Sequence, residues 1–230
     1  MVVRFGAVLL AGGRASRMGG IDKPGLLVDG VSMRDRAIAA VVSVGADPIV
    51  VVGPEPDAVV PPADADASHD AGHEPAAAAT ASDTTSASGT ARAAVRWVRE
   101  DPPFSGPAAA VVTALEVPGA DAVEWTFLLA CDLPHPEVAV ARLMSGIPAL
   151  PPETDGACLV DETGRAQWLT GVYRTPALVS AASALPDGGR DQPVRALLAG
   201  LSVELIHDSG DGAQDVDTWD DYEQLTKEHP

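Results

Sequence analysis

Short, continuous apolar runs recur along the chain and alternate with segments in which apolar residues follow a helical spacing. The runs that predict strands are Phe5 to Leu10, Pro48 to Val52, Ala94 to Val98 and Trp125 to Ala130. Helices are predicted at Met33 to Val44 and Pro107 to Glu116. Continuous apolar runs are typical of strands buried on both faces, so this alternation predicts an α/β domain with a mostly parallel sheet between two helical layers.

The pattern changes after residue 155, where two runs stand close together in the sequence. Gly156 to Val160 and Gln167 to Tyr173 are joined by a turn at Glu162 to Gly164 and predict an antiparallel hairpin at one edge of the sheet. The remaining predicted elements are helices at Pro176 to Ala184 and Gln192 to Leu198, a strand at Ser202 to Ile206, and a helix at Asp217 to Lys227 that Thr218 caps.

Residues 55 to 93 differ in composition from the segments before and after them, because Ala, Ser, Thr, Asp and Pro replace almost all large apolar side chains. Such a composition buries too little apolar surface to offset the entropy lost on ordering. We therefore predict a flexible low-complexity insertion at about 60–92 within a single domain that spans residues 1–230. A short Ala-rich helix at Ala76 to Ala81 is the alternative, although it has no large side chain to pack.

Composition narrows the class of partner. The 230 residues include 33 acidic and 15 basic side chains, a formal net charge of -18, which argues against binding to nucleic acid or to an anionic membrane. Cys131 and Cys158 have the spacing of neither a zinc site nor a disulfide framework, and the apolar start is too short for a secretory leader. We expect a cytoplasmic protein, and the composition leaves monomer and homo-oligomer open.

The segment from Leu10 to Lys23, LAGGRASRMGGIDK, joins the first strand to a turn rich in glycine and basic residues. Glycines let the backbone bend toward a ligand, while Arg14, Arg17 and Lys23 supply positive charge. In so acidic a chain this predicts a site for a triphosphate. The alternative is a tight strand-to-helix loop that needs glycine for its geometry alone. The spacing matches neither a Walker A loop nor the Gly-x-Gly-x-x-Gly of dinucleotide folds.

Asp132 comes almost directly after the strand Trp125 to Ala130. In open α/β sheets ligands bind beyond the carboxyl ends of strands, and both Asp132 and the glycine loop lie just past such an end. Asp132 is therefore a candidate ligand for a metal or substrate. Its alternative role is to cap the turn before Pro134.

The glycine loop resembles the signature of the MobA-like nucleotidyltransferases, the family that includes molybdenum cofactor guanylyltransferase. The matching residues are Leu10, Ala11, Gly12, Gly13, Arg17, Met18, Gly19, Asp22 and Lys23. Further segments resemble family motifs in the same order: Glu100-Asp101 before Gly106-Pro107, Cys131 to Pro134, Leu169 to Arg174, and Asp215 to Thr218. The resemblance covers nearly the whole chain apart from the predicted insertion.

This resemblance implies a Rossmann-like three-layer fold and an Mg²⁺-dependent enzyme that transfers a nucleotide from an NTP. It implies that the loop wraps the nucleotide, that Lys23 contacts its phosphates, that Asp132 binds Mg²⁺ and substrate, and that Asp101 contacts the nucleoside. The residues assigned to nucleotide binding are Leu10, Ala11, Gly12, Gly13, Lys23, Gly53, Asp101 and Asp132. Those assigned to catalysis are Arg17, Lys23 and Asp132, and those assigned to the metal are Asp132 and Asp217.

Nucleotidyl transfer requires basic and metal-binding groups of this kind, whichever family the chain resembles. Nucleotidyl transfer brings a phosphate acceptor to the α-phosphorus of a triphosphate, so two anions must be held together while pyrophosphate leaves. Mg²⁺ binds few carboxylates beside phosphate and water oxygens, so Asp132 is adequate and Asp217 is a candidate second ligand. The reaction needs no protein nucleophile.

Two departures from the family pattern bear on the substrates. Ala110 stands where the family often has a second glycine after Gly106-Pro107, and its methyl group can crowd the pocket. Asp215 and Asp217 replace an Asn-x-Asn pair and would repel an anionic pterin phosphate unless a metal intervenes, although they can also be a turn and a helix start. The predicted reaction is transfer of GMP from GTP to the phosphate of molybdopterin. The alternatives are use of CTP, a sugar or alditol phosphate acceptor, and a nucleotide-binding regulatory protein without turnover.

Overall fold

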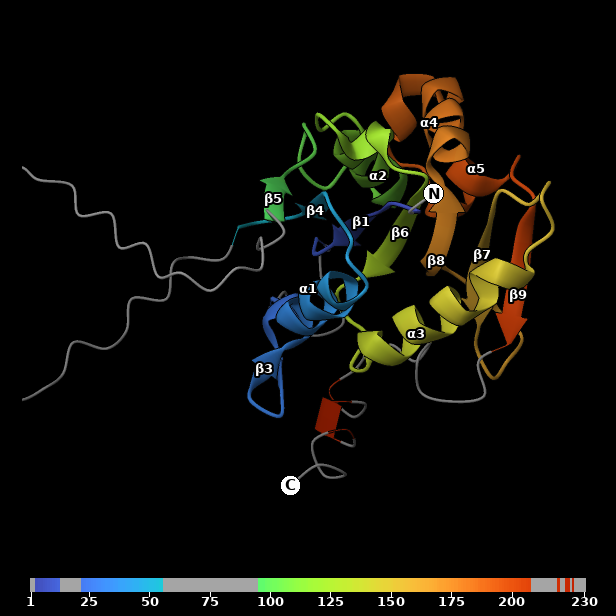
Figure 1. Ribbon diagram of the computed structural model, residues 1–230. Coiled ribbons are helices and arrows are strands. Elements are labelled where there is room, and N and C mark those ends of the chain that lie inside the picture. The colour runs from blue at the N-terminus through green and yellow to red at the C-terminus, as the bar shows by residue number, and fades with distance from the viewer. Residues whose placement is uncertain are drawn as a thin grey trace, which may run out of the picture. The chain divides into compact units, whose positions relative to one another are not determined.

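Strand β1 (Phe5–Leu10) lies inside a seven-stranded sheet of order β5-β4-β1-β6-β8-β7-β9 (Figure 1). The other strands are β4 (Ile49–Val52), β5 (Val95–Val98), β6 (Trp125–Ala130), β7 (Gly156–Val160), β8 (Ala166–Arg174) and β9 (Val203–His207). The computed structural model describes residues 3–12, 22–55, 95–207, 219, 222, 223 and 225. All of these belong to one unit, Met1–Glu55 with Ala93–Pro230. The predicted insertion at about 60–92 lies outside the described residues.

The sheet is mostly parallel, as the apolar runs predict. β1 pairs in parallel with β4 on one side and with β6 on the other, and β5 pairs in parallel with β4. β8 is antiparallel to both β6 and β7, while β9 is parallel to β7. β4 and β6 lie on opposite sides of β1, so the order in which the chain adds strands reverses at β1. The loops after β1 and β6 flank this switch point, and open α/β sheets bind ligands at such a point.

The predicted hairpin is confirmed as β7 and β8, and β9 is added outside it as the outermost strand. Its turn is organised by Asp161, whose Oδ1 accepts hydrogen bonds from the backbone N–H groups of Thr163 and Arg165 at 2.9 and 3.0 Å. Such Asx-type bonding stabilises a reversal of the chain without help from the core. The strand predicted at Ser202 to Ile206 is β9. It pairs with β7 along its whole length and forms the edge of the sheet.

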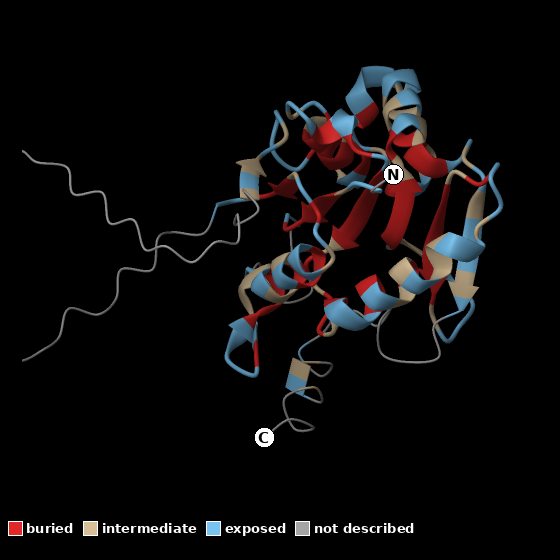
Figure 2. Cartoon of the chain, viewed as in Figure 1, coloured by how far each residue is buried: buried red, intermediate tan, exposed pale blue. Residues whose placement is uncertain are grey.

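The helices cover both faces of the sheet. They are α1 (Met33–Ser43), α2 (Pro107–Leu115), α3 (Pro136–Gly146), α4 (Thr175–Ala184) and α5 (Val194–Leu198). Alternate strand residues point to opposite faces, so Leu9 packs in a cluster with residues of α1 and α3, while Val8 packs with residues of α2, α4 and α5. Figure 1 shows the two groups of helices on either side of the strands, and Figure 2 shows the buried strands between them.

Helix α3 was not among the elements predicted from the sequence. Its buried residues Pro136, Ala139, Val140 and Leu143 follow the helical spacing i, i+3, i+4, i+7, and proline stands in its first turn. The pattern was therefore present, but it follows so closely on Cys131 to Pro134 that the segment reads as a turn. Of the predicted helix Asp217 to Lys227, the described residues 219, 222, 223 and 225 are helical.

A short hairpin stands between the first strand and α1. It consists of β2 (Leu27–Val28) and β3 (Val31–Ser32), joined through Asp29 and Gly30, both at positive φ. Ser32 then caps α1, because its Oγ accepts a hydrogen bond from the Asp35 backbone N–H at 3.0 Å.

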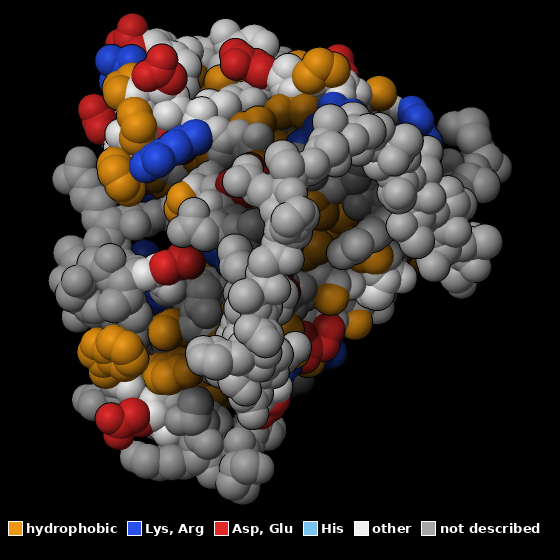
Figure 3. All heavy atoms as spheres, turned by 90° about the vertical axis from the view of Figure 1, so that its left-hand side faces the viewer, with side chains coloured by type: hydrophobic (Ala, Val, Ile, Leu, Met, Phe, Trp, Pro, Cys, Tyr) orange, Lys and Arg blue, Asp and Glu red, His pale blue; other side chains and the backbone are white. Residues whose placement is uncertain are grey.

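Figure 3 shows the side of the molecule toward β5, where hydrophobic and charged side chains are interspersed. No helix among the described residues has the length and apolar character needed to span a bilayer.

Candidate functional site

Two segments that lie 109 residues apart in the sequence meet beyond the carboxyl ends of β1 and β6. The Lys23 Nζ donates a hydrogen bond to Asp132 Oδ2 at 2.9 Å. Lys23 is the first residue of the 3-10 helix η2 (Lys23–Gly25), which follows the glycine loop, and Asp132 is the second residue after β6. The pairing of Leu10 with Ala130, followed by a 3.0 Å bond from the Cys131 N–H to the Leu10 carbonyl, brings the segments together.

This ion pair is partly buried. The side chains of Lys23 and Asp132 are 14% and 26% exposed, so both are partly shielded yet reachable from solvent. A lysine ammonium carries three donors, so it can contact a phosphate oxygen while it also contacts a carboxylate. Partial burial lowers the local dielectric and strengthens each of these charge interactions.

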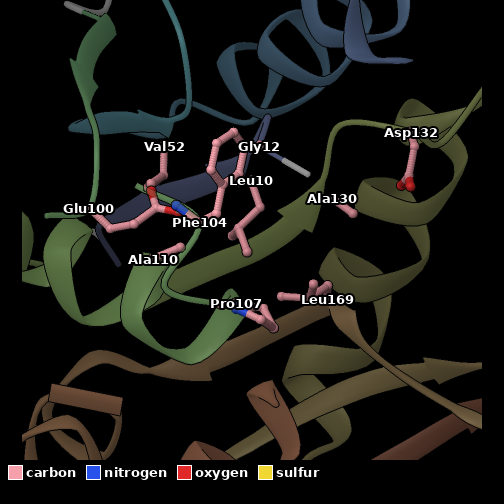
Figure 4. Close-up of a pocket in the computed structure, with 11 residues that line it drawn as sticks. Leu10, Gly12, Val52, Glu100, Phe104, Pro107, Ala110, Ala130, Asp132 and Leu169 are labelled. Atoms are coloured by element: carbon pink, nitrogen blue, oxygen red, sulfur yellow. The ribbon is translucent and has the colours of Figure 1, made fainter. Parts of the chain in front are cut away.

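A cavity of about 390 Å³ adjoins Asp132. Its lining residues are Leu10, Gly12, Val52, Glu100, Phe104, Gly106, Pro107, Ala110, Ala130, Asp132 and Leu169. In Figure 4 the two carboxylates, Glu100 and Asp132, lie at opposite ends of the group, with apolar side chains between them. A concave apolar cavity of this size with a few polar groups is typical of a small-molecule site.

Phe104 lies at the edge of this cavity in an unusual conformation. Its φ is +65°, and its residue is 47% exposed. Positive φ is unfavourable for a bulky residue, and such strain is concentrated at functional sites. The Phe104 backbone N–H donates to Glu100 Oε1 at 3.1 Å, and the Arg99 guanidinium lies 5.4 Å from the ring centroid. Glu100 and Arg99 therefore hold an aromatic ring at a position where a flat ligand could stack on it.

The chain was compared with known families and structures. A sequence model of the MobA-like NTP transferase domain matches residues 7–206. The protein belongs to this family. Its substrate class is therefore a nucleoside triphosphate. A search of curated proteins finds no match.

Solved structures similar to this MobA-like chain cover nearly all of it. Rv0371c from Mycobacterium tuberculosis H37Rv is 20% identical with a TM-score of 0.62, over 98% of this chain and 99% of that one. A nucleotidyl transferase from Methanothermobacter thermautotroptrophicus, Mth528, is 18% identical with a TM-score of 0.61, over 98% and 97%. A complex of Rv0371c with manganese is 19% identical with a TM-score of 0.57, over 99% and 100%. At these identities the likeness shows the fold, which confirms the predicted α/β architecture.

The structure brings several of the predicted site residues of this MobA-like domain together. Leu10, Gly12 and Asp132 line the cavity, and Lys23 contacts Asp132. Ala11 is buried, and its N–H donates to the Val52 carbonyl at 2.8 Å. These residues lie at the carboxyl ends of β1, β4 and β6.

Gly53 contributes through its backbone. Its φ is +154°, and a Cβ at this position would lie 2.8 Å from the Ala11 carbonyl carbon. Its N–H donates to the Val98 carbonyl at 3.0 Å. Gly53 thus lets the segment after β4 pass close beside the start of the glycine loop, although it is not among the residues that line the cavity.

Asp101 is exposed and is not among the residues that line the cavity, whereas the neighbouring acid, Glu100, lines it. Ala110 is buried on the cavity wall, where the resemblance places a crowding methyl group. Gly13, Arg17 and Asp217 lie outside the described residues. Phe104 and Val52 were not identified from the sequence as site residues. The signal that the sequence offers is their position: Phe104 lies between Asp101 and Gly106, and Val52 ends a predicted strand.

The thiol of Cys131, beside Asp132, is buried. Burial raises the pKa of Cys131 far above its ordinary value, the Asp132 charge raises it further, and Arg34 opposes the effect only in part. Burial likewise raises the pKa of Cys158 to about 11, against a smaller opposing effect of its hydrogen bond with Tyr173. Both thiols stay protonated near neutral pH and are poor nucleophiles.

Asp132 has carboxylate oxygens of the kind that bind a divalent metal. Within residues 3–12, 22–55, 95–207 and the described positions beyond, no group of three or more His, Cys, Asp or Glu side chains is placed around one point. Mg²⁺ needs only one or two carboxylates when phosphate and water oxygens complete its octahedron. A single partly exposed carboxylate beside a lysine fits that requirement.

Proposed function

We propose that this protein transfers GMP from GTP to the phosphate of molybdopterin, with Mg²⁺ as cofactor and pyrophosphate as the second product. The observation that carries the proposal is the 2.9 Å contact between Lys23 and Asp132 at one end of an apolar cavity. A triphosphate requires positive charge and a metal-binding carboxylate together, and a nucleoside requires an adjoining apolar space. Membership of the NTP transferase family supports the same reaction class.

The donor would lie with its phosphates at Lys23 and its nucleoside in the cavity. Guanine presents two adjacent N–H donors on one edge, which suit a carboxylate acceptor such as Glu100 at the far end of the cavity. Cytosine and adenine each offer an amino group there, while uracil would place a carbonyl against negative charge on at least one side. The carboxylate therefore favours guanine, which presents two donors to it, and we propose GTP as donor.

The chain's own groups would act by position and charge. An oxygen of the acceptor phosphate forms a bond to the α-phosphorus, the bond from that phosphorus to the bridging oxygen breaks, and pyrophosphate leaves with the electron pair. Lys23 would offset negative charge on the phosphates, and Asp132 would hold Mg²⁺, with Asp217 as a second candidate ligand. Bound Mg²⁺ would neutralise the charge that develops on the leaving group. The protonated thiols fit a direct transfer with no covalent enzyme intermediate.

The deciding experiment measures pyrophosphate release with each of the four nucleoside triphosphates, with and without molybdopterin, in Mg²⁺ and in EDTA. We expect release that requires GTP, molybdopterin and the metal. Release with CTP instead would support the cytidylyl alternative, and release with a sugar or alditol phosphate would change the acceptor. Tight GTP binding without release under any of these conditions would overturn the proposal in favour of a nucleotide-binding regulatory protein.

The same assay would test the setting of the reaction. Cys131 and Cys158 are free thiols in the structure, which suits the reducing cytoplasm that we propose as the location. Activity that is unchanged by millimolar dithiothreitol is expected. A requirement for oxidising conditions would contradict that location.

A further inference from the structure

Arg34, in the first turn of α1, is a buried charge that the proposed reaction does not use. The residue is 7% exposed, and its Nε is a buried donor without a hydrogen-bond partner. Burying a guanidinium is expensive, and a missing hydrogen bond adds to that penalty. An apolar residue would be more stable at this position unless the positive charge serves a purpose there.

The charge of Arg34 is directed at the residue that precedes Lys23. Its Nη1 lies 3.4 Å from Asp22 Oδ2, and its guanidinium carbon lies 5.7 Å from the ring centroid of Trp97. The Asp22 side chain, which is 55% exposed, is folded over Gly25, where a Cβ would lie 2.5 Å from the same Oδ2. Arg34 therefore ties α1 to the 3-10 helix η2 that begins with Lys23.

The local charge balance explains why this link matters for an anionic substrate. Without Arg34, one ammonium on Lys23 would stand beside two carboxylates, Asp22 and Asp132, and the described group would carry a net negative charge. Arg34 offsets one unit of that negative charge. Solvent screens the Arg34–Asp22 pair only partly, so a change in its charge alters the binding energy of a nearby phosphate appreciably.

We infer that Arg34 is a positioning residue for the triphosphate. It neutralises Asp22 and holds it against η2, so that Lys23 presents its charge to the donor phosphates. This inference rests on the proposed function only as far as the site binds a triphosphate, since Arg34 acts through Asp22 and touches no reacting atom.

Arg36 provides a matched control on the same helix. Its Nη2 lies 2.8 Å from Asp29 Oδ2 and also donates to the Val28 carbonyl at 2.8 Å. The two arginines therefore make comparable ion pairs with an aspartate that precedes α1. Only the pair formed by Arg34 involves the residue next to Lys23, whereas Arg36 serves the β2–β3 hairpin.

The test measures the affinity of inorganic tripolyphosphate with Mg²⁺ by calorimetry, for the wild type, R34M, R36M, D22N and R34M/D22N. We expect R34M to weaken binding about tenfold at low salt, with a smaller loss at 0.5 M salt, because the effect is electrostatic. R36M should bind within about twofold of the wild type, because its ion pair lies away from the site. Adding D22N should remove most of the R34M defect, since the uncompensated carboxylate is then gone.

Several results would overturn this inference. They are an equal loss in R36M, an R34M defect that persists in full in the D22N background, or a defect that salt does not change. If R34M fails to fold, R34K replaces it: affinity within about threefold of the wild type supports a charge role, and a loss as large as that of K23A contradicts it. Tripolyphosphate binding without nucleotidyl transfer would defeat the proposed function alone. Absence of binding to the wild type would defeat both.

Discussion

The two parts of the sheet are built for different purposes. In the parallel part, β5-β4-β1-β6, the carboxyl ends of all four strands lie at one edge. The last residues of β1, β4 and β6, the segments after β1, β5 and β6, and the start of α2 supply every cavity residue except Leu169. In the other part, β8-β7-β9, the antiparallel β8 contributes Leu169 and nothing else to the cavity lining. Strand direction therefore decides which part carries the site, because only parallel neighbours bring successive loops to the same edge.

The second part is instead specialised for packing. The Tyr173 ring, fully buried, lies over Gly171, where an added Cβ would come within 2.7 Å of its hydroxyl oxygen. That hydroxyl donates to the Trp168 carbonyl at 2.8 Å. The same ring fills the space above Gly156, where a Cβ would lie 2.5 Å from the Tyr173 Cδ1. Mutations here should change stability, and mutations in the parallel part should change substrate binding and turnover.

The largest effect is expected from the ion pair at the parallel edge. K23A and D132N should each lower kcat/KM for nucleotidyl transfer by at least about a hundredfold, because each removes a charge that the phosphates or the metal require. Pyrophosphate release measures this, with D121N as a control at an exposed acid of the 3-10 helix η3 (Ala120–Ala122). Retention of wild-type turnover in either variant would remove the ion pair from the mechanism.

A pair of glycine substitutions tests the comparison most directly. G53A should raise KM for the nucleotide by about tenfold or more, because a Cβ there pushes on the backbone of Ala11 in the glycine loop. G171A should lower the free energy of unfolding by about 1–3 kcal/mol through its clash with Tyr173, while KM stays unchanged. Thermal unfolding and steady-state kinetics measured on both variants would contradict the comparison if the two effects were exchanged.

Phe104 should show a smaller effect that depends on the base. F104A should weaken GTP binding about tenfold, since base stacking on an aromatic ring contributes about 1–3 kcal/mol. Binding of inorganic tripolyphosphate should stay the same, because that ligand has no base. F104Y is the conservative control and should bind GTP as the wild type does. Equal losses for both ligands in F104A would show that the ring supports the loop rather than the nucleoside.

Tyr173 should affect stability alone. Y173F removes the hydrogen bond to the partly buried Trp168 carbonyl, so the free energy of unfolding should fall by about 1 kcal/mol. Chemical denaturation measures the loss, and KM for GTP should match the wild type. A change in KM would mean that the two parts of the sheet are coupled more strongly than their topology suggests.

The smallest effect belongs to the hairpin turn. Hydrogen bonds from the Thr163 hydroxyl and the Arg165 N–H lower the pKa of Asp161 from 3.8 to about 2. A carboxylate with a lowered pKa stabilises the fold above its unfolded pKa, and that contribution is lost as the pH falls from about 4 toward 2. D161N should therefore unfold at a slightly lower temperature at pH 7, and the difference should shrink below pH 4. A difference independent of pH would assign the effect to the amide rather than to the charge.

Much of the fold could be predicted from the sequence because the relevant signals are local. The apolar runs predict β1, β4, β5 and β6, and the rule that ligands bind at the carboxyl ends of strands predicts that the glycine loop and Asp132 lie at one site. The position of β9 outside the hairpin was not accessible, since it depends on long-range pairing with β7. Helix α3 was missed because a motif rich in turn-forming residues precedes it.

The site was less predictable where two neighbouring side chains compete. Glu100 and Asp101 are both acids after a strand, and which of them faces the cavity depends on the path of the loop. That path is set by the positive φ of Phe104 and by the bond from the Ser105 hydroxyl to the Pro102 carbonyl. Neither feature has a signature that the sequence reveals, because phenylalanine is an unusual choice at positive φ.

The deep burial of both native thiols makes the chain convenient for spectroscopy. Cys131 and Cys158 are inaccessible and remain protonated, so maleimides and iodoacetamides should react with them slowly. A cysteine introduced on an exposed rim residue would then be the dominant reactive group. A fluorophore or spin label could be attached at the mouth of the cavity without first removing a native cysteine, and ligand entry could be followed in real time.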